Sequence, residues 1–337
     1  MKPADAEITI ETLDYHTAGE PLRIIKSGLP EIPGDTMLAK RCYMQNELDH
    51  IRALLMREPR GHAEMYGAVL TDPVTDDGDV GVLFMHNGGY STMCGHAIIA
   101  LVYAGLEQGL FSIRDSEAIR FDTPAGRVVA KALLLKDGRI GQVSFLNVPS
   151  FVLEPEYSVK VDGRAVDMTI AFGGAFYAYV DARSLGFELL PQEAQQLISL
   201  GRKIKTAVQT HYPIDHPDGD EDLNFLYGTI FVRQDEQAGH SRNACVFADG
   251  QLDRSPTGTG VSGRAAIAWS RGELALGESL QIESIIGTKF QVRCAGETTA
   301  GGLRAIIPEV SGTASMTGQH LFVLDSRDSL PQGFQFT

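Results

Sequence analysis

The sequence predicts an α+β protein that contains two similar halves. Short stretches of alternating apolar and polar residues, typical of strands, recur on either side of two strongly apolar helices. The landmarks of the two halves are similarly spaced, since 75 residues separate Gly19 from Cys94 and 83 separate Gly174 from Thr257. This repetition indicates an internal duplication in which Cys94 and Thr257 occupy equivalent positions. The alternative is a coincidence between two ordinary α+β halves.

The first half begins with a strand pair around a turn and continues into a long helix. Thr36 or Asp35 can cap this helix, which should stop near Pro59. Further strands flank the acidic turn at residues 76–79 and surround the first apolar helix. The expected strands are residues 8–14, 22–25, 66–71, 80–85, 119–123, 127–135 and 142–146, and the expected helices are 37–56 and 97–106.

The second half repeats this order. Its first helix carries Pro191 in its opening turn, where a missing N–H is tolerated. The expected strands are residues 166–171, 175–180, 226–232, 244–248, 280–284, 289–294 and 303–308, and the expected helices are 190–206 and 261–269. A last strand at 320–324 packs back on the first half. The predicted division is residues 1–150 plus 312–337, with Cys94, and residues 151–311, with Thr257.

Composition excludes several classes of partner. The chain has 337 residues, of which 43% are hydrophobic and 21% charged, and this is typical of a globular protein. Its formal net charge of −14 argues against nucleic acid or an anionic membrane as partner, because no basic patch could neutralise phosphates. An anionic substrate must therefore be held locally, by helix ends or a few donors.

Cysteine usage and hydropathy point to a cytoplasmic enzyme. The four cysteines lie far apart without a CxxC pair, which favours neither a disulfide framework nor a zinc site. The sequence contains no run of about 18 apolar residues, so it predicts no membrane span. The first ten residues lack the basic and apolar regions of a signal peptide.

Cys94 stands where a glycine-rich turn enters the first apolar helix. With Ser91 or Thr92 as N-cap, Cys94 would lie in the first helical turn, near free N–H groups and the positive end of the helix dipole. A thiol there is expected to have a lowered pKa, and the same N–H groups can hold a carboxylate. The alternative is that Cys94 is one of the many cysteines that serve only packing.

Thr257 enters the second apolar helix in the same manner. If the two halves face each other, both helix N-termini point into one cleft, which is where ligand sites tend to form. Cys94 and Thr257 would then flank a small carboxylate that the helix ends bind.

At these residues the sequence resembles the proline racemase family, which includes proline racemases, 4-hydroxyproline epimerases and trans-3-hydroxy-L-proline dehydratases. The resemblance covers nearly the whole chain. It implies two pseudo-symmetric diaminopimelate-epimerase-like halves, each a mixed, largely antiparallel sheet around a central helix. It also implies an imino acid substrate, no cofactor or metal, and often a homodimer. The motifs that carry it are DYHTAGEPLR (14–23), STMCGH (91–96), FGGAF (172–176), HP (216–217) and DRSPTGTG (253–260).

One position departs from the racemase pattern. Racemases and epimerases of this family carry a second cysteine where Thr257 stands here. A threonine hydroxyl has too high a pKa to act as a base near neutral pH, so two-base epimerisation is not expected. Cys94 paired with Thr257 resembles the trans-3-hydroxy-L-proline dehydratase pattern. The hypothesis is that the Cys94 thiolate removes the Cα proton and returns it to the departing 3-hydroxyl, so that water leaves. The product would be Δ1-pyrroline-2-carboxylate, and Thr257 would only hydrogen-bond or fill space.

The resemblance assigns further substrate-binding residues. The amides of Gly95, His96, Gly258 and Thr259 would hold the carboxylate and stabilise charge as the proton leaves. The ring of His96 should not face the thiol of Cys94, because two helical positions separate them.

Each of three other residues could bind the substrate or could have only a structural role. Asp253 resembles the family acid that pairs with the substrate ammonium, or it only forms a turn. Phe247 would pack on the ring carbons, or belong to the core. His216, in an acidic loop, could contact the substrate hydroxyl or act as its acid, or it could be a solvated loop histidine.

The leading hypothesis is thus a cofactor-free hydro-lyase. Its nearest rival is a 4-hydroxyproline epimerase or proline racemase, against which the missing second thiol argues. A catalytically inactive imino-acid-binding homologue is the alternative from another class. A cysteine hydrolase is disfavoured, because no His–acid pair is placed to activate the thiol.

Overall fold

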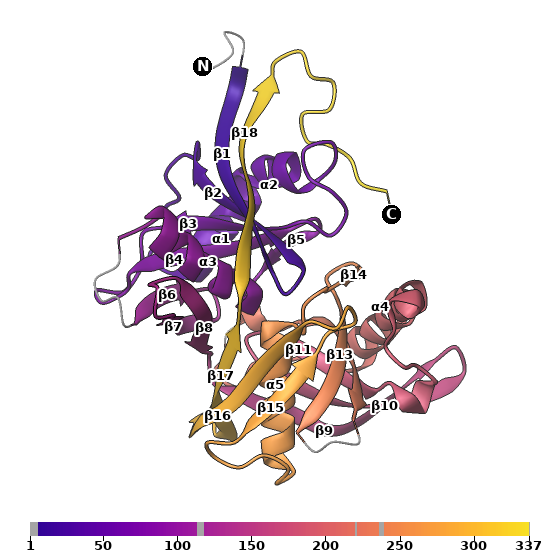
Figure 1. Cartoon of the computed structure of the whole chain (residues 1–337). Coiled ribbons are helices and arrows are strands. Elements are labelled where there is room, and N and C mark those ends of the chain that lie inside the picture. The colour runs from indigo at the N-terminus through magenta and orange to yellow at the C-terminus, as the bar shows by residue number, and fades with distance from the viewer. Residues whose placement is uncertain (1–5, 113–117, 220, 236–238, 337) are drawn as a thin grey trace.

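The computed structural model describes residues 6–112, 118–219, 221–235 and 239–336. Its first half, in indigo to magenta in Figure 1, follows the predicted order of strands and helices. The elements are β1 (Ala6–Thr17), β2 (Glu20–Ser27), α1 (Met37–Glu47), α2 (Asp49–Met56), β3 (Tyr66–Thr71), β4 (Val80–His86), β5 (Gly89–Ser91), α3 (Gly95–Gln108), β6 (Ile119–Thr123), β7 (Gly126–Leu134) and β8 (Ile140–Leu146).

The second half repeats this arrangement below the first in the same view (Figure 1). Its elements, with the strand that returns to the first half, are β9 (Ser150–Val161), β10 (Arg164–Phe172), β11 (Phe176–Asp181), α4 (Ala194–His211), β12 (Leu226–Gln234), β13 (His240–Phe247), β14 (Gln251–Leu252), α5 (Gly258–Ser270), β15 (Ser279–Glu283), β16 (Lys289–Ala300), β17 (Leu303–Gly312) and β18 (Ala314–Asp325).

The two halves share one strand topology. In each, a parallel strand pair is connected through a peripheral helical segment: β2 pairs with β3 across α1 and α2, and β11 pairs with β12 across α4. A second parallel pair is connected through the central helix: β4 pairs with β6 across α3, and β13 with β15 across α5. The remaining pairings are antiparallel, as in β1–β2 and β10–β11. Each half is therefore a mixed, largely antiparallel sheet around a helix, as predicted.

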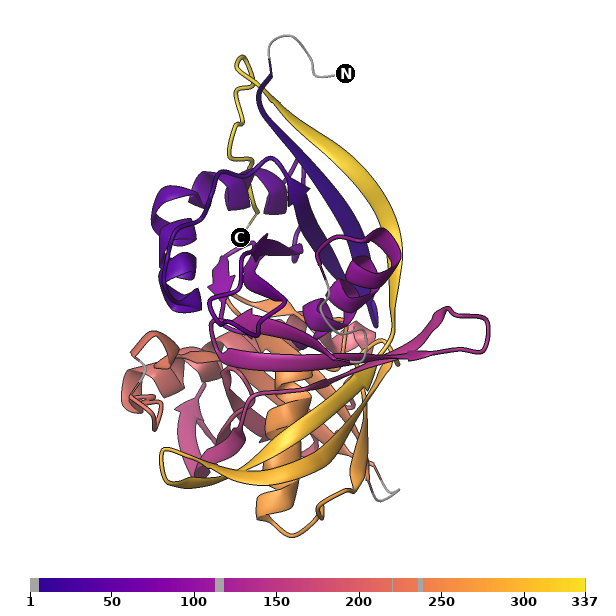
Figure 2. The ribbon, with the colours of Figure 1, turned by 90° about the vertical axis from the view of Figure 1, so that its left-hand side faces the viewer.

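One long C-terminal ribbon joins the two sheets. β17 pairs with β9 and β16, which closes the strands of the second half around α5. β17 also pairs with β8, and β18 continues upward to pair along β1. Figure 2 shows α5 upright within the lower half, with the yellow ribbon passing in front of it. We propose on this topology that residues 1–150 with 312–337 form one half and 151–311 the other; residues 1–5 and 337 lie outside the described part.

The central helices are buried on every side. All residues of α3 from Gly95 to Gly105 and all of α5 from Gly258 to Ala268 are buried. Most of their side chains are apolar or small, which suits burial on all sides, and the buried Arg264 of α5 donates a hydrogen bond to Gln234 Oε1 at 2.8 Å. Along the described part of the chain, no helix combines the length and apolar character needed to cross a membrane.

Two expectations about local structure were wrong. The predicted helix over residues 37–56 is two helices, because Leu48 leaves the helical conformation (φ −121°, ψ 13°) between α1 and α2. The strand β9 was missed because its sequence contains Pro155, which cannot donate to a ladder. Pro155 is accommodated where the β9–β10 register shifts, and its carbonyl accepts a bond from Thr169 Oγ1.

A buried ion pair ties the peripheral helices to the first sheet. The Arg23 guanidinium contacts both carboxylate oxygens of Asp14, the shortest distance being 2.8 Å. Its Nη1 donates to the carbonyls of Leu55 at 2.7 Å and Arg60 at 2.8 Å. This network fixes the end of α2 against β2, so the two charges are both paired and hydrogen-bonded.

Replacing Arg23 by Met should lower the free energy of unfolding by about 3–5 kcal/mol, because the Asp14 carboxylate would stay buried without its partner. Urea unfolding followed by circular dichroism would measure this. Lys203→Met is the matched control, since its pair with Asp162 is exposed and should contribute under about 1 kcal/mol. Equal effects of the two substitutions would contradict the assignment of Arg23 as an anchor.

Candidate active site

The N-termini of α3 and α5 meet at two glycines. A Cβ placed on Gly258 would lie 2.5 Å from the Cα of Gly95, and one placed on Gly95 would lie 2.6 Å from the Cα of Gly258. Only glycine allows the two backbones to approach this closely. The cleft expected between the halves is therefore formed by the first turns of both central helices.

Cys94 is itself the N-cap residue of α3, with extended backbone (φ −145°, ψ 107°). The expectation that Ser91 or Thr92 caps this helix was wrong. Both hydroxyls have other partners, since Ser91 Oγ bonds the Tyr66 hydroxyl and Thr92 Oγ1 donates to the carbonyl of Gly174 at 2.8 Å. Thr92 thus connects the two halves.

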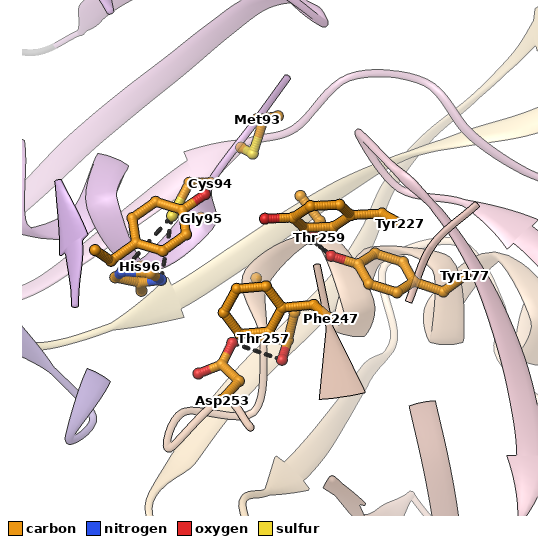
Figure 3. A pocket seen from close by; sticks show the side chains of 12 residues that line it. Met93, Cys94, Gly95, His96, Tyr177, Tyr227, Phe247, Asp253, Thr257 and Thr259 are labelled. Carbon is orange, nitrogen blue, oxygen red and sulfur yellow. Dashed lines mark hydrogen bonds between the residues drawn. The ribbon is translucent and has the colours of Figure 1, made fainter. Parts of the chain in front are cut away.

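A small, largely closed pocket lies at the junction of the helices (Figure 3). Eight residues singled out in the sequence line it: Cys94, Gly95, His96, Phe247, Asp253, Thr257, Gly258 and Thr259. Four further lining residues were not foreseen: Tyr66, Met93, Tyr177 and Tyr227. Since no lysine or arginine is among the twelve, the helix ends are the main positive feature of the pocket.

Backbone N–H groups at these ends are available to an anion. The first helical bonds are donated by Ile98 to the Cys94 carbonyl at 3.1 Å and by Val261 to the Thr257 carbonyl at 2.8 Å. The N–H groups of Gly95 and His96 in α3, and of Gly258 and Thr259 in α5, precede these ladders, as at every helix start, whereas the Ala97 N–H interacts with the Cys94 thiol. Two such ends in contact form a cradle suited to one carboxylate.

His216 lies away from this pocket. Its ring packs against a cluster of phenylalanines in the second half, with centroid distances of 5.7 Å to Phe151 and 4.9 Å to Phe172. Its backbone N–H donates to Asn224 Oδ1 at 2.7 Å, which fixes the loop on that side. His216 is not among the residues that line the pocket, and its predicted contact with the substrate stays a prediction.

The thiol of Cys94 faces the ring of His96. Its Sγ lies 3.1 Å from Nδ1 and 3.7 Å from Nε2, contrary to the expectation that the two side chains diverge (Figure 3). The reason is the N-cap position: Cys94 has extended backbone, so helical spacing does not apply between it and His96. Either neutral tautomer of the ring leaves one nitrogen able to accept the thiol proton.

Burial sets the protonation of both groups. It raises the pKa of the Cys94 thiol well above its ordinary value, and the backbone N–H of Ala97 opposes this only in part. The predicted lowering of the pKa of Cys94 is therefore wrong, because loss of hydration outweighs the helix end. Burial also lowers the pKa of His96 to about 4, so its ring is neutral at pH 7.

Thr257 occupies the equivalent N-cap of α5 in a strained conformation. Its φ of 68° is unusual for a β-branched residue. Its hydroxyl donates to Asp253 Oδ2 at 2.7 Å, and its N–H donates to Ser255 Oγ at 3.1 Å. Asp253 Oδ1 accepts the Ser255 N–H at 2.7 Å. This network fixes Asp253 beside Thr257, across the pocket from Cys94 (Figure 3).

Comparison with known proteins identifies the family. The proline racemase family model matches residues 12–335. The chain belongs to the proline racemase family.

Curated relatives of this family carry different activities. A trans-3-hydroxy-L-proline dehydratase of Colwellia psychrerythraea is 46% identical, over 98% of this chain and 93% of its own. A 3-hydroxyproline 2-epimerase of Burkholderia multivorans is 43% identical, over 97% of this chain and 98% of its own.

A solved structure confirms the fold. A hydroxyproline epimerase of Agrobacterium vitis with bound trans-4-hydroxy-L-proline superposes with a TM-score of 0.92 at 30% identity, covering 99% of this chain and 96% of the other. The prediction of two diaminopimelate-epimerase-like halves is thus confirmed.

Two of the unforeseen tyrosines are related by the duplication of this proline racemase family chain. Tyr66 opens β3 in the segment MYGAVL, and Tyr227 lies at the start of β12 in LYGTIF. β3 and β12 are equivalent strands of the two halves. A Tyr-Gly pair at corresponding places, 28 residues before Cys94 and 30 before Thr257, is a signal that sequence analysis could have used.

Metal binding finds no support in the part of the chain that the structure covers, where no three His, Cys, Asp or Glu side chains cluster suitably. All four cysteines are free.

Gly258→Ala should lower the free energy of unfolding by about 1–3 kcal/mol, because the added methyl group would overlap the Gly95 backbone. Urea unfolding would measure the change. Gly296→Ala is the control, since the nearest atom to its Cβ would be the Ile307 side chain at 3.8 Å. A Gly258→Ala protein as stable as the control would contradict the proposed contact.

Alkylation of Cys94 by iodoacetamide should accelerate about tenfold per pH unit between about pH 7 and 9, because its pKa is raised and the thiolate is scarce throughout. Mass spectrometry of the peptide that carries Cys94 would give the rates. In urea-unfolded protein the same peptide should begin to level off near the ordinary thiol pKa of about 8.5. A plateau below about pH 8 in the folded protein would contradict burial as the dominant effect.

Proposed function

We propose that this protein is a trans-3-hydroxy-L-proline dehydratase that needs no cofactor. Cys94 removes the Cα proton, the 3-hydroxyl leaves as water, and the resulting enamine tautomerises to Δ1-pyrroline-2-carboxylate. The observation that carries the proposal is the unequal pair of N-caps: a thiol at one helix start and a threonine hydroxyl, already donated to Asp253, at the other.

This inequality favours elimination over inversion. Inversion at Cα needs a base on one ring face and an acid on the other, both with a pKa suited to neutral pH. Thr257 supplies no such group. In trans-3-hydroxy-L-proline the Cα hydrogen and the hydroxyl lie on the same ring face, so groups on the Cys94 side of the pocket can act on both.

The other lining residues suit an imino acid. The N–H groups at both helix ends would bind the carboxylate and stabilise the charge that develops on it as the Cα proton leaves. The Asp253 carboxylate would pair with the ring ammonium, at the side of the pocket that Thr257 shares. Phe247 would cover the ring carbons, since its ring is held between Tyr66, His86 and Tyr227.

His96 would accept the proton of the resting thiol. The buried thiol is protonated, the neutral ring is 3.1 Å away, and Asp253 favours the charged form of that ring. Transfer of the proton yields a thiolate–imidazolium pair beside the bound substrate. The imidazolium would also offset the charge of the substrate carboxylate.

The decisive experiment offers purified protein trans-3-hydroxy-L-proline and assays the pyrroline product. The same protein is incubated with L-proline, trans-4-hydroxy-L-proline and trans-3-hydroxy-L-proline while optical rotation reports inversion. Pyrroline formation without inversion supports the proposal. Rapid inversion with no dehydration would replace it by an epimerase, the activity of the Burkholderia multivorans relative.

Cys94→Ser should reduce pyrroline formation by at least about a hundredfold, because a serine hydroxyl is a far weaker base. Circular dichroism of the variant confirms that it folds. A variant with near wild-type activity would eliminate Cys94 as the base.

Thr257→Cys places a second thiol at the start of α5 and should add exchange or inversion at Cα to the remaining dehydration. Proton NMR in D₂O together with chiral chromatography would detect both. Thr257→Ser, which keeps the hydroxyl that donates to Asp253, is the control and should gain neither reaction. Retained dehydration without any inversion would mean that more than the missing thiol blocks the second face.

A further inference from the structure

The hydroxyl of Tyr227 is buried and makes no hydrogen bond of regular geometry with the described residues, although the hydroxyls of Tyr66 and Ser91 lie close to it. Tyr227 is 6% exposed and lines the pocket, where its hydroxyl end is directed toward the side that holds Cys94 (Figure 3). A buried hydroxyl without a well-aligned partner is unfavourable and rare. Its place in the pocket lining therefore leaves it able to bind a polar group of the ligand.

The ring of Tyr227 is held in place on several sides. Its centroid lies 5.6 Å from that of Phe247, 5.8 Å from Tyr177 and 6.2 Å from Phe225, and the His86 ring is 6.0 Å away. Rotation of the side chain to find another partner would disrupt these contacts. The hydroxyl is thus a fixed donor, as a residue that recognises one substrate group requires.

Tyr66 links this hydroxyl to the thiol. Its own hydroxyl bonds Ser91 Oγ, and it lies close enough to the Cys94 thiol and to the Tyr227 hydroxyl to shift the pKa of both. The two equivalent tyrosines of the halves therefore both lie on the Cys94 side. Burial raises the pKa of each well above its ordinary value, so both carry their protons at pH 7.

We propose that Tyr227 binds the 3-hydroxyl of the substrate and protonates it as it leaves, and that Tyr66 returns the proton from Cys94. The inference rests on the proposed dehydratase function. It also places the base and the acid on the same side of the substrate ring, which is the side where the Cα hydrogen and the 3-hydroxyl of the trans-3-hydroxy isomer both lie.

The proton balance closes within these groups. The Cα–H proton passes to Cys94 Sγ, the C3–O bond breaks, and the Tyr227 proton completes the departing water. Tyr66 then gives its proton to the Tyr227 phenolate and receives one from Cys94, which regenerates the thiolate. A phenol, even with a raised pKa, remains a suitable acid because the pKa of water is about 15.7.

Tyr227→Phe tests the proposal, because it keeps the ring and removes only the hydroxyl. Pyrroline formation should fall at least about a hundredfold, whereas deuterium exchange at Cα in D₂O, which needs only Cys94, should stay within about tenfold of wild type. Tyr103→Phe, at a buried tyrosine of α3 outside the pocket lining, is the control and should change neither rate. Pyrroline formation within threefold of wild type, or equal loss of both reactions, would overturn the proposal.

A binding measurement separates this inference from the proposed function. In a Cys94→Ser background, which prevents turnover, calorimetry compares trans-3-hydroxy-L-proline with L-proline. The hydroxylated ligand should bind at least about tenfold more tightly, and adding Tyr227→Phe should abolish that preference. If wild type forms no pyrroline, the dehydratase proposal fails. An unchanged preference in the double variant would refute the role of Tyr227 whatever the turnover.

Discussion

The backbone contact between Gly95 and Gly258 is the constraint on which the site depends. It brings the N-termini of two buried helices within van der Waals contact, at a distance that any side chain would prevent. The residues immediately before these glycines, Cys94 and Thr257, must then flank one shared pocket. The same contact combines two sets of free N–H groups into one anion-binding end, which compensates for the negative charge of the molecule as a whole.

Burial then determines the chemistry that this geometry can perform. Glu20 lies behind the Asp253 turn, where one oxygen accepts the Arg254 N–H at 2.8 Å and the other has no partner among the described residues. Burial raises the pKa of Glu20, and the neighbouring Asp253 adds to the shift. Burial therefore favours the neutral forms of the Cys94 thiol and of the Glu20 carboxyl group. In the proposed mechanism the thiolate of Cys94 and the imidazolium of His96 form beside the bound substrate, whose carboxylate offsets the positive charge.

Much of this arrangement could be predicted from the sequence, because the strands and the apolar helices are local patterns. The duplication and the two helix starts, with Cys94 and Thr257, follow from such patterns, whereas lining residues such as Asp253 and Phe247 were expected from the family resemblance. The relation between Cys94 and His96 could not be predicted, since it depends on which residue caps the helix. That choice was decided by distant partners of Ser91 and Thr92, namely Tyr66 and Gly174.

The pKa of Cys94 was predicted in the wrong direction for a related reason. Position at a helix start is visible in a sequence, but the extent of desolvation is not, and here desolvation is the larger effect. Tyr66 and Tyr227 were missed because a tyrosine in an apolar strand looks like any core residue. Only the repeated Tyr-Gly pair distinguishes them, and it acquires meaning once β3 and β12 are known to be equivalent.

The duplicated frame explains how a single substitution can redirect chemistry. Two halves with one topology present equivalent helix starts to opposite sides of a ligand, which by itself favours a reaction that treats both faces alike. The two halves have the same topology, but the groups at their helix starts differ. Cys94 faces His96 and Tyr66, whereas Thr257 is hydrogen-bonded to Asp253. The two tyrosines break the symmetry further, because Tyr227 from the second half reaches toward Cys94 of the first. In the proposed mechanism acid and base groups are thereby gathered on one face, so that a symmetric scaffold would support an asymmetric reaction.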